Sequence, residues 1–250
     1  MNPSDDVYAK GMVDWQQEDD RIVDRYRVWQ LDLVRPYLGR RILEIGAGTG
    51  QLAQFLMRTH AYDKYVAIEP SPHFFASLRE VATNTQNFEV LQATAPELPK
   101  SYDGAFDTVF SIHVMEHIED DAAFLRECIR LTRPGGHVVV LVPALQFLYS
   151  PLDEKIGHFR RYEKAMLTNL AAKLGMELVV NRYDNLIGVL GWWWLCKVRG
   201  IDYHTIDNKR SFTTHVAMFT KYVLPIVSAV ERHVAPPLGL NLTSVLRKPS

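Results

Sequence analysis

The sequence predicts an α/β fold in which a mostly parallel β-sheet is covered by helices on both faces. Short β-rich apolar runs alternate with segments whose apolar residues recur every three to four positions. Strands buried on both faces read as continuous apolar runs, and a connection between parallel strands usually contains a helix. The chain has 250 residues, which suits a single domain over 1–250 with an insertion or cap.

The predicted elements follow one another in the order that this fold requires. Strands are expected at 41–45, 65–68, 88–91, 106–112, 137–142, 176–182 and 241–247. Helices are expected at 15–35, 52–57, after Ser71, after Asp120 or Asp121, and at 163–174. Ser71 is a good N-cap for its helix, and Pro134 with the two glycines after it should end the helix before them.

The composition excludes several function classes. Lysine and arginine number 28 and aspartate and glutamate 29, so the net charge of −1 gives no overall attraction for nucleic acid. Cys128 and Cys196 have no C-x-x-C spacing, which disfavours a cysteine-type zinc site and favours a reducing compartment. The acidic N-terminus does not resemble a secretory signal, and no stretch reaches the roughly eighteen apolar residues of a membrane span. We therefore expect a cytoplasmic protein without nucleic-acid partners.

Two segments lie outside the regular alternation. Residues 1–38 form an N-terminal helical extension, whose aromatic residues 8–15 and 26–29 are expected to close over a ligand as a lid. Residues 185–238 form an apolar insert before the last strand, with three consecutive tryptophans and a helical pattern that Pro225 should kink or break. We favour a role of the insert in the core or as a substrate cap. The alternative is peripheral membrane contact through residues 186–196 and 215–234.

A glycine turn directly follows the first strand and opens a helix. Gly46, Gly48 and Gly50 let the backbone approach a ligand closely, and the helix start offers free N–H groups. Gln51 stands where the dinucleotide fingerprint requires glycine, which weakens a pyrophosphate site. Glu69 ends the second strand, where a carboxylate can accept hydrogen bonds from both ribose hydroxyls. The pattern therefore favours a nucleoside site.

Four segments together resemble the class I S-adenosylmethionine-dependent methyltransferases. They read ILEIGAGTGQL, VAIEPS, FDTVFSIHVMEHIED and LTRPGGHVVVLVPA, and they cover residues 41–144 in the order and spacing of that family. The resemblance implies a Rossmann-like three-layer sandwich with a seven-stranded, mostly parallel sheet, an antiparallel last strand, and S-adenosyl-L-methionine as cofactor. Many members have aspartate where Thr94 stands, so backbone contacts to adenine are an alternative there. The cofactor-binding residues implied are Glu44, Gly46, Ala47, Gly48, Gly50, Glu69, Pro70, Ala93, Thr94, Ser111 and His113.

The segment after the fourth strand contains His113, Glu116 and His117 in the spacing H-x-x-E-H. This spacing is a zinc-protease motif only when a helix places both histidines on one face, and here it follows a strand end. We therefore expect no metal. The resemblance instead puts the segment beside the transferred methyl group, where His117 is either catalytic or a loop residue at a helix entry.

The loop after the fifth strand ends with the polar residues His158, Arg160, Arg161 and Tyr162. Ligands bind at this edge of open α/β sheets, so His158 is a candidate proton acceptor and the other three are candidate substrate-binding residues. The structural alternative is that Asp153 pairs with an arginine and that Tyr162 packs against the next helix. A subset of bacterial class I methyltransferases is similar through this loop, but no substrate comes with that similarity.

The function expected from these features is methyl transfer to a small-molecule acceptor. One form of this hypothesis has an apolar or lipid-like acceptor. Oxygen is the default acceptor atom, and His117 and His158 are the candidate bases for its proton. A nicotinamide-dependent oxidoreductase is an alternative, which Gln51 and the lack of a well-placed Tyr-x-x-x-Lys pair disfavour. A non-catalytic donor-binding module at a membrane surface is the third possibility.

Overall fold

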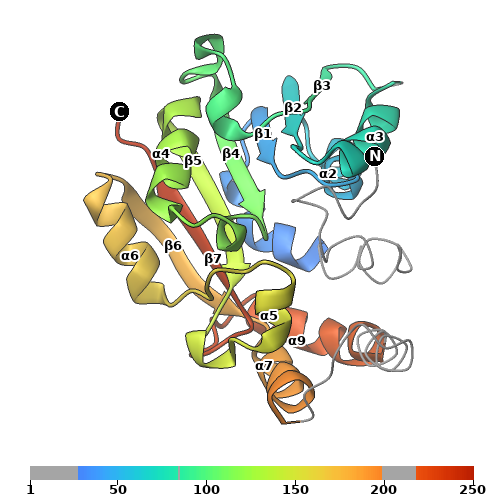
Figure 1. Cartoon of the computed structure of the whole chain (residues 1–250), viewed down its shortest axis with the longest axis vertical. Helices are drawn as coiled ribbons and strands as arrows, with labels where there is room; N and C mark the ends of the chain where they lie inside the picture. The colour runs from blue at the N-terminus through green and yellow to red at the C-terminus, as the bar shows by residue number, and fades with distance from the viewer. Residues whose placement is uncertain (1–27, 84, 199–217) are drawn as a thin grey trace.

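The computed structural model describes residues 28–83, 85–198 and 218–250, which form a seven-stranded sheet between two helical layers (Figure 1). Its strand order is β3-β2-β1-β4-β5-β7-β6. Strands β1 to β5 pair in parallel, and β7 runs antiparallel to both of its neighbours. The Rossmann-like α/β fold with an antiparallel last strand is thus confirmed. The strands are β1 (Arg41–Ile45), β2 (Lys64–Ile68), β3 (Phe88–Leu91), β4 (Phe106–Ile112), β5 (Thr132–Pro143), β6 (Glu177–Asp184) and β7 (Asn241–Arg247).

The two faces of the sheet carry different helices. Helical residues 28–34, α2 (Gln51–Thr59) and α3 (Pro72–Ala82) cover one face, and α4 (Asp121–Leu131) and α6 (Lys164–Lys173) cover the other (Figure 1). Alternate residues of each strand point to opposite faces, so each buried strand contributes to both halves of the core. The short helices are η2 (Arg35–Tyr37), η3 (Ala95–Glu97), η4 (Lys100–Tyr102), η5 (Met115–His117), η6 (Gln146–Leu148) and α5 (Pro151–Lys155).

The local signals in the sequence explain where most elements begin and end. The side chain of Ser71 accepts a hydrogen bond from the Phe74 N–H at 3.3 Å, and that of Asp120 accepts one from Ala123 at 2.8 Å. Strand β5 differs from its prediction, because it begins at Thr132 instead of residue 137. Its register with β4 shifts before His137, so the proline and glycines form an irregular stretch of the strand edge.

The described part of the insert consists of two short helical units. Helix α7 (Leu186–Trp192) continues as the π-helical η7 (Trp193–Val198), and the π-helical η8 (Phe219–Val223) leads into α9 (Leu224–Glu231). Pro225 lies in the first turn of α9, directly after the π-helical η8, so the helical run continues through the proline with an irregular stretch before it instead of breaking there. The predicted lid residues 1–27 and the insert residues 199–217 lie outside the described residues.

Two buried carboxylates join the insert to the edge of the sheet. Glu231 of α9 accepts hydrogen bonds from the N–H groups of Asn185 at 2.7 Å and Leu186 at 2.9 Å, where α7 begins. Asp184, at the end of β6, accepts hydrogen bonds from the side chains of Asn241 and Thr243, both at 2.8 Å. Burial raises the pKa of Asp184. The insert is therefore anchored where β6 and β7 meet.

The Glu231 contacts predict a measurable contribution to stability. Replacing Glu231 by alanine leaves two N–H groups at the start of α7 without these partners, so we expect the free energy of unfolding to fall by about 1–3 kcal/mol. Glu80→Ala, at an exposed position of α3, is the matched control and should change it by less than about 0.5 kcal/mol. Urea unfolding followed by circular dichroism measures both. Equal stability of the two variants would show that the Glu231 anchor contributes nothing.

Candidate functional site

The predicted site residues lie at the carboxyl ends of the parallel strands. The glycine turn follows β1, Glu69 and Pro70 follow β2, and Ala93 and Thr94 follow β3. His113 and His117 follow β4, and the loop with His158 follows β5. The strand order reverses direction between β1 and β4, and such a reversal at the carboxyl edge is where open α/β sheets bind ligands. The topology thus brings these residues to one edge of the molecule.

Glycine is required at two positions of the turn. Gly46 and Gly50 have φ angles of +75° and +82°, in the left-handed region. A Cβ atom on Gly46 would lie 2.4 Å from Cγ2 of Val114, and one on Gly50 would lie 2.8 Å from Cδ1 of Leu78. The turn therefore packs directly on the segment that follows β4, and α2 begins immediately after it.

Glu69 is held beside this turn by backbone hydrogen bonds. Its Oε2 accepts one from the Gly48 N–H at 2.8 Å, and its Oε1 accepts one from the Ser71 N–H at 2.9 Å. The residue is 5% exposed. A carboxylate fixed at the end of β2, next to a turn without side chains, fits a nucleoside whose ribose hydroxyls need an acceptor.

Other residues of the predicted cofactor set have contacts within the protein. Glu44 is buried and accepts a hydrogen bond from the Tyr65 hydroxyl at 2.6 Å, and burial raises the pKa of Tyr65 well above its usual value. Both the N–H and the hydroxyl of Thr94 donate to Oε2 of Glu97, at 2.6 and 2.7 Å. The Thr94 hydroxyl is therefore engaged in the turn that begins η3. Ser111 is buried within β4, and its Oγ has no hydrogen-bond partner in the part of the chain that the structure describes.

A histidine and carboxylate cluster lies after β4. Glu116 is fully buried, and its Oε1 is 3.2 Å from Nδ1 of His113 and 3.9 Å from Nε2 of His158. The rings of His117 and His158 meet edge to face with their centroids 4.7 Å apart. Burial lowers the pKa of His117, which favours its neutral form. Burial alone would raise the pKa of Glu116, but the pKa is lowered because the His113 side chain forms a hydrogen bond with the carboxylate.

The loop 150–162 is built around Asp153. Its Oδ1 is 2.9 Å from Nδ1 of His158 and 2.8 Å from both Nε and Nη2 of Arg161, and its Oδ2 accepts from the N–H and hydroxyl of Ser150, both at 2.9 Å. Burial alone would raise the pKa of Asp153, but these partners hold it below its usual value. The carboxylate thus fixes one ring nitrogen of His158.

Three predicted substrate-binding residues also contact the protein. Arg161 is 1% exposed, and its guanidinium carbon lies 4.4 Å from the ring centroid of Trp192. Tyr162 is fully buried, and its hydroxyl donates to the Met115 carbonyl at 3.3 Å. These contacts match the structural alternative: Arg161 and Tyr162 position the loop and present no polar group to solvent. Arg160 lies nearer the surface and pairs with Asp121 at 3.2 Å.

Sequence reasoning missed Glu116 as a functional residue of its own. The signal was present, because Glu116 stands between two histidines in the H-V-M-E-H segment that follows the strand. The protease motif needs a helix that carries both histidines, and the structure does not show one: His113 follows β4 with a φ of +55°, and His117 ends the single turn η5.

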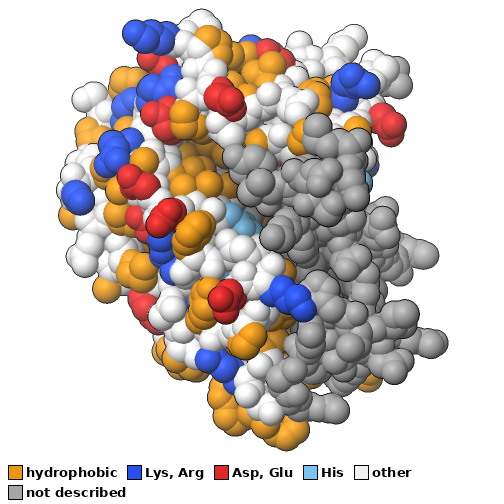
Figure 2. Space-filling view, viewed as in Figure 1, with side chains coloured by type: hydrophobic (Ala, Val, Ile, Leu, Met, Phe, Trp, Pro, Cys, Tyr) orange, Lys and Arg blue, Asp and Glu red, His pale blue; other side chains and the backbone are white. Residues whose placement is uncertain are grey.

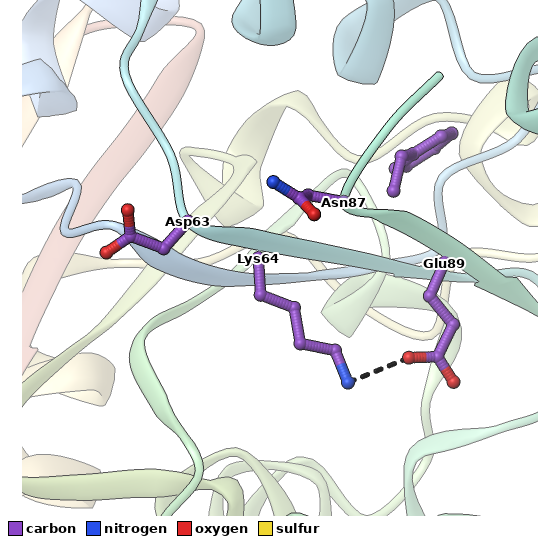
Figure 3. A pocket seen from close by; sticks show the side chains of 5 residues that line it. Asp63, Lys64, Asn87 and Glu89 are labelled. Carbon is purple, nitrogen blue, oxygen red and sulfur yellow. Dashed lines mark ion pairs between the residues drawn. The ribbon is translucent and has the colours of Figure 1, made fainter. Parts of the chain in front are cut away.

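A separate pocket lies at the opposite edge of the sheet (Figure 3). Its lining comes from the amino ends of β2 and β3, and Nζ of Lys64 pairs there with Oε2 of Glu89 at 2.8 Å. Ligands of open α/β sheets bind at the carboxyl edge, so this pocket is distinct from the candidate site. The lining residues are Asp63, Lys64, Asn87, Phe88 and Glu89.

Solved structures of other proteins share this fold. The Haloferax volcanii protein solved with the Trm112 methyltransferase activator is similar with a TM-score of 0.64 and 18% identity, over 100% of this chain and 98% of that one. A Haemonchus contortus phosphoethanolamine N-methyltransferase, in complex with S-adenosyl-L-methionine, is similar with a TM-score of 0.59 and 18% identity, over 88% and 52%. At these identities the similarity is one of fold.

Sequence comparison identifies the family. A family model described as a methyltransferase domain matches residues 43–140. The ubiquinone biosynthesis O-methyltransferase of Acinetobacter baumannii (strain ACICU) is 33% identical over 100 residues, which is 40% of this chain and 42% of that relative. The matched part thus spans less than half the length of the relative. It contains the glycine turn, Glu69 and the segment after β4, and this matched region belongs to the class I S-adenosylmethionine-dependent methyltransferases.

Proposed function

We propose that the chain is an active enzyme that transfers a methyl group from S-adenosyl-L-methionine to a hydroxyl group of a small, apolar acceptor. The observation that carries the proposal is the contact between the glycine turn at 46–50, which we call the donor cradle, and the segment that holds the histidine cluster of His113, Glu116, His117 and His158. Val114, which packs on Gly46, is the residue after His113 and lies two before Glu116. A donor held by the glycine turn would therefore present its methyl group toward side chains that can accept a proton. The name of the curated relatives supports oxygen as the acceptor atom.

The donor-binding residues act by positioning. S-adenosyl-L-methionine supplies an activated methyl group on a sulfonium centre. The turn at Gly46, Gly48 and Gly50 holds its methionine end, and Glu69 orients the ribose through hydroxyl hydrogen bonds. Ala93 and the Thr94 backbone border the adenine in this arrangement. Alignment of donor and acceptor accounts for much of the rate when the methyl group is already activated.

The histidines supply a place for the acceptor proton. Asp153 accepts the Nδ1 hydrogen of His158, so the tautomer assigned to His158 carries its lone pair on Nε2. His117 lies against the His158 ring, and its lowered pKa favours a neutral imidazole. An acceptor hydroxyl placed between this pair and the donor can lose its proton to either ring as the new C–O bond forms and the S–C bond to the methyl group breaks, with its electron pair left on sulfur.

An apolar surface next to the site favours a lipid-like acceptor. Hydrophobic side chains gather at the lower end of the molecule in Figure 2, where Figure 1 places α7. Trp192 of α7 connects this surface to the site loop, because its Nε1 donates to the Leu148 carbonyl at 3.3 Å and its ring lies under Arg161. Large exposed patches of this kind mark interaction surfaces. The large hydrophobic residues exposed on the described part of the insert include Leu186, Ile187, Leu190, Trp193, Trp194, Val198, Met218, Tyr222, Ile226, Val230 and Val234.

We include peripheral contact with a bilayer in the proposal. Exposed Trp193 and Trp194 have the amphipathic character of interfacial anchors, and Lys197 and Lys221 of the same insert are exposed and can attract anionic headgroups. Across the described ranges, no helix has the length and apolar character needed to cross a membrane. The contact we propose is therefore with one surface of a bilayer.

Donor binding is tested on Glu69. Because Glu69→Ala removes the ribose acceptor, we expect the affinity for S-adenosylhomocysteine to fall by about 1.5–3 kcal/mol, or roughly tenfold to 150-fold. Isothermal titration calorimetry measures this, with Glu80→Ala as the control of unchanged affinity. NADH titrated in parallel should give no heat. Tight binding of NADH alone would favour the oxidoreductase instead, and full donor affinity in Glu69→Ala would remove Glu69 from the site.

Catalysis is tested on His158. His158→Gln should lower turnover by about a hundredfold or more while donor affinity stays unchanged, because a proton acceptor contributes to the chemical step. Labelled donor, a panel of hydroxylated apolar acceptors and mass spectrometry give the turnover. Full activity of the variant argues against a role for His158. No turnover by the unmodified chain with any acceptor would favour a non-catalytic donor-binding module.

Membrane contact is tested by flotation with anionic liposomes. The double change Trp193→Ser and Trp194→Ser should reduce the bound fraction several-fold, because it removes the exposed aromatic anchors. Val179→Ser, at an exposed apolar position on β6, is the matched control. An unmodified chain that stays with the soluble fraction contradicts the bilayer contact and leaves the methyl transfer untouched.

A further inference from the structure

We propose that Glu116, His117 and His158 bind a divalent transition-metal ion that coordinates the acceptor hydroxyl. The inference deepens the proposed methyl transfer and rests on it. One ligand atom from each residue lies within 4.8 Å of the other two. Glu116 and His117 come from the turn after β4, and His158 comes from the loop after β5. Two separate loops thus converge on one small volume with the ligand types of a metal centre.

One oxygen of the Glu116 carboxylate has no partner among the described residues, and a bound cation could serve as that partner. The Glu116 side chain is fully buried, and its Oε2 has no hydrogen-bond partner within residues 28–83, 85–198 and 218–250. Burying a polar atom without a partner costs about 1–3 kcal/mol, and more when the group is charged. His113 satisfies only Oε1. A bound cation beside Oε2 would remove this cost, and among the described residues no side chain or backbone group does so.

Asp153 orients His158 for coordination. A histidine ligand usually donates its other ring N–H to a carboxylate, which fixes the ring and its tautomer. Nδ1 of His158 is 2.9 Å from Oδ1 of Asp153, which leaves Nε2 facing Glu116 at 3.9 Å from its Oε1. The Nε2 lone pair of His158 and the carboxylate of Glu116 then face each other, and a cation placed between them would interact favourably with both. Ser150 and Arg161 hold Asp153 in place.

The donor set indicates which ions would bind. Two imidazole nitrogens and one carboxylate suit Zn²⁺, Co²⁺ or Mn²⁺ better than Mg²⁺ or Ca²⁺, which prefer all-oxygen sites. Three protein ligands leave at least one position open, as in catalytic metal centres. The set also differs from the protease motif, because His158 takes the place of His113 and no single helix carries the ligands.

The ion would change how the acceptor loses its proton. A hydroxyl bound to a divalent cation has a lower pKa than the free group, so its O–H bond breaks and the proton passes to solvent. The resulting oxygen attacks the methyl carbon, the C–O bond forms, and the electron pair of the broken S–C bond stays on sulfur. In this scheme His117 and His158 hold the ion, and they accept the proton themselves only when no ion is bound.

The test is metal binding by the untagged full-length chain after removal of ions with a chelator and dialysis. Calorimetric titration with Zn²⁺ and Mn²⁺ should show one ion bound per chain, and Mg²⁺ should bind more weakly. Glu116→Gln and His158→Gln should each weaken Mn²⁺ binding by at least about tenfold. The exposed His233→Gln is the matched control with unchanged binding. Mn²⁺ should raise the thermal midpoint of the unmodified chain and of this control only.

Donor binding and turnover separate the two levels of the proposal. If the unmodified chain binds S-adenosylhomocysteine but no ion, or if all variants bind Mn²⁺ alike, the metal site is overturned and the methyl transfer stands. The stoichiometry of the unmodified chain decides the question even if a variant fails to fold. Activity that survives complete chelation contradicts the role of the ion at the acceptor, and restored activity on adding Mn²⁺ supports it.

Discussion

Gly46 is packed so closely against Val114 that no side chain fits between the turn after β1 and the segment after β4. This contact determines the distance between the glycine turn and the histidine cluster, because Val114 follows His113 directly. The left-handed backbone at Gly46 makes the approach possible without strain. The parallel pairing of β1 with β4 puts both turns at the same edge of the sheet. The arrangement of the site depends on this one close approach.

Buried ion pairs of Asp153 determine the conformation of the loop 150–162, which follows β5. A buried charge is costly unless a partner compensates it, and Asp153 has Ser150, His158 and Arg161 around it. The same guanidinium stacks on Trp192, which belongs to the insert. The loop that carries His158 is thus connected to the apolar surface of α7. Acceptor recognition and catalysis share this one network in our account.

Much of the fold could be predicted from the sequence because its signals are local. Apolar runs gave six strands nearly their observed bounds, and Ser71 and Asp120 begin their helices as their hydrogen-bonding side chains predict. Strand β5 started earlier than expected, since pairing with β4 outweighed the turn tendency of its proline and glycines. A tertiary partner can override a local preference in this way.

The positions of the glycine turn and of Glu69 followed from their motifs, but the histidine cluster did not. Gly46 and Glu69 lie in patterns whose spacing reflects one turn and one strand end. Glu116 and His158 are distant in the sequence and meet only because the loops after β4 and β5 lie together. For Arg161 the sequence allowed both substrate binding and a pair with Asp153, and only the structure shows that the side chain is buried on Asp153.

The most direct test of the account is a crystal structure of the chain with S-adenosylhomocysteine bound. The account predicts the ribose hydroxyls on the Glu69 carboxylate, the amino-acid end on the turn at Gly46, and the sulfur facing the segment from His113 to His117. An adenosyl ligand bound elsewhere, or a crevice that stays vacant at saturating ligand, would contradict it.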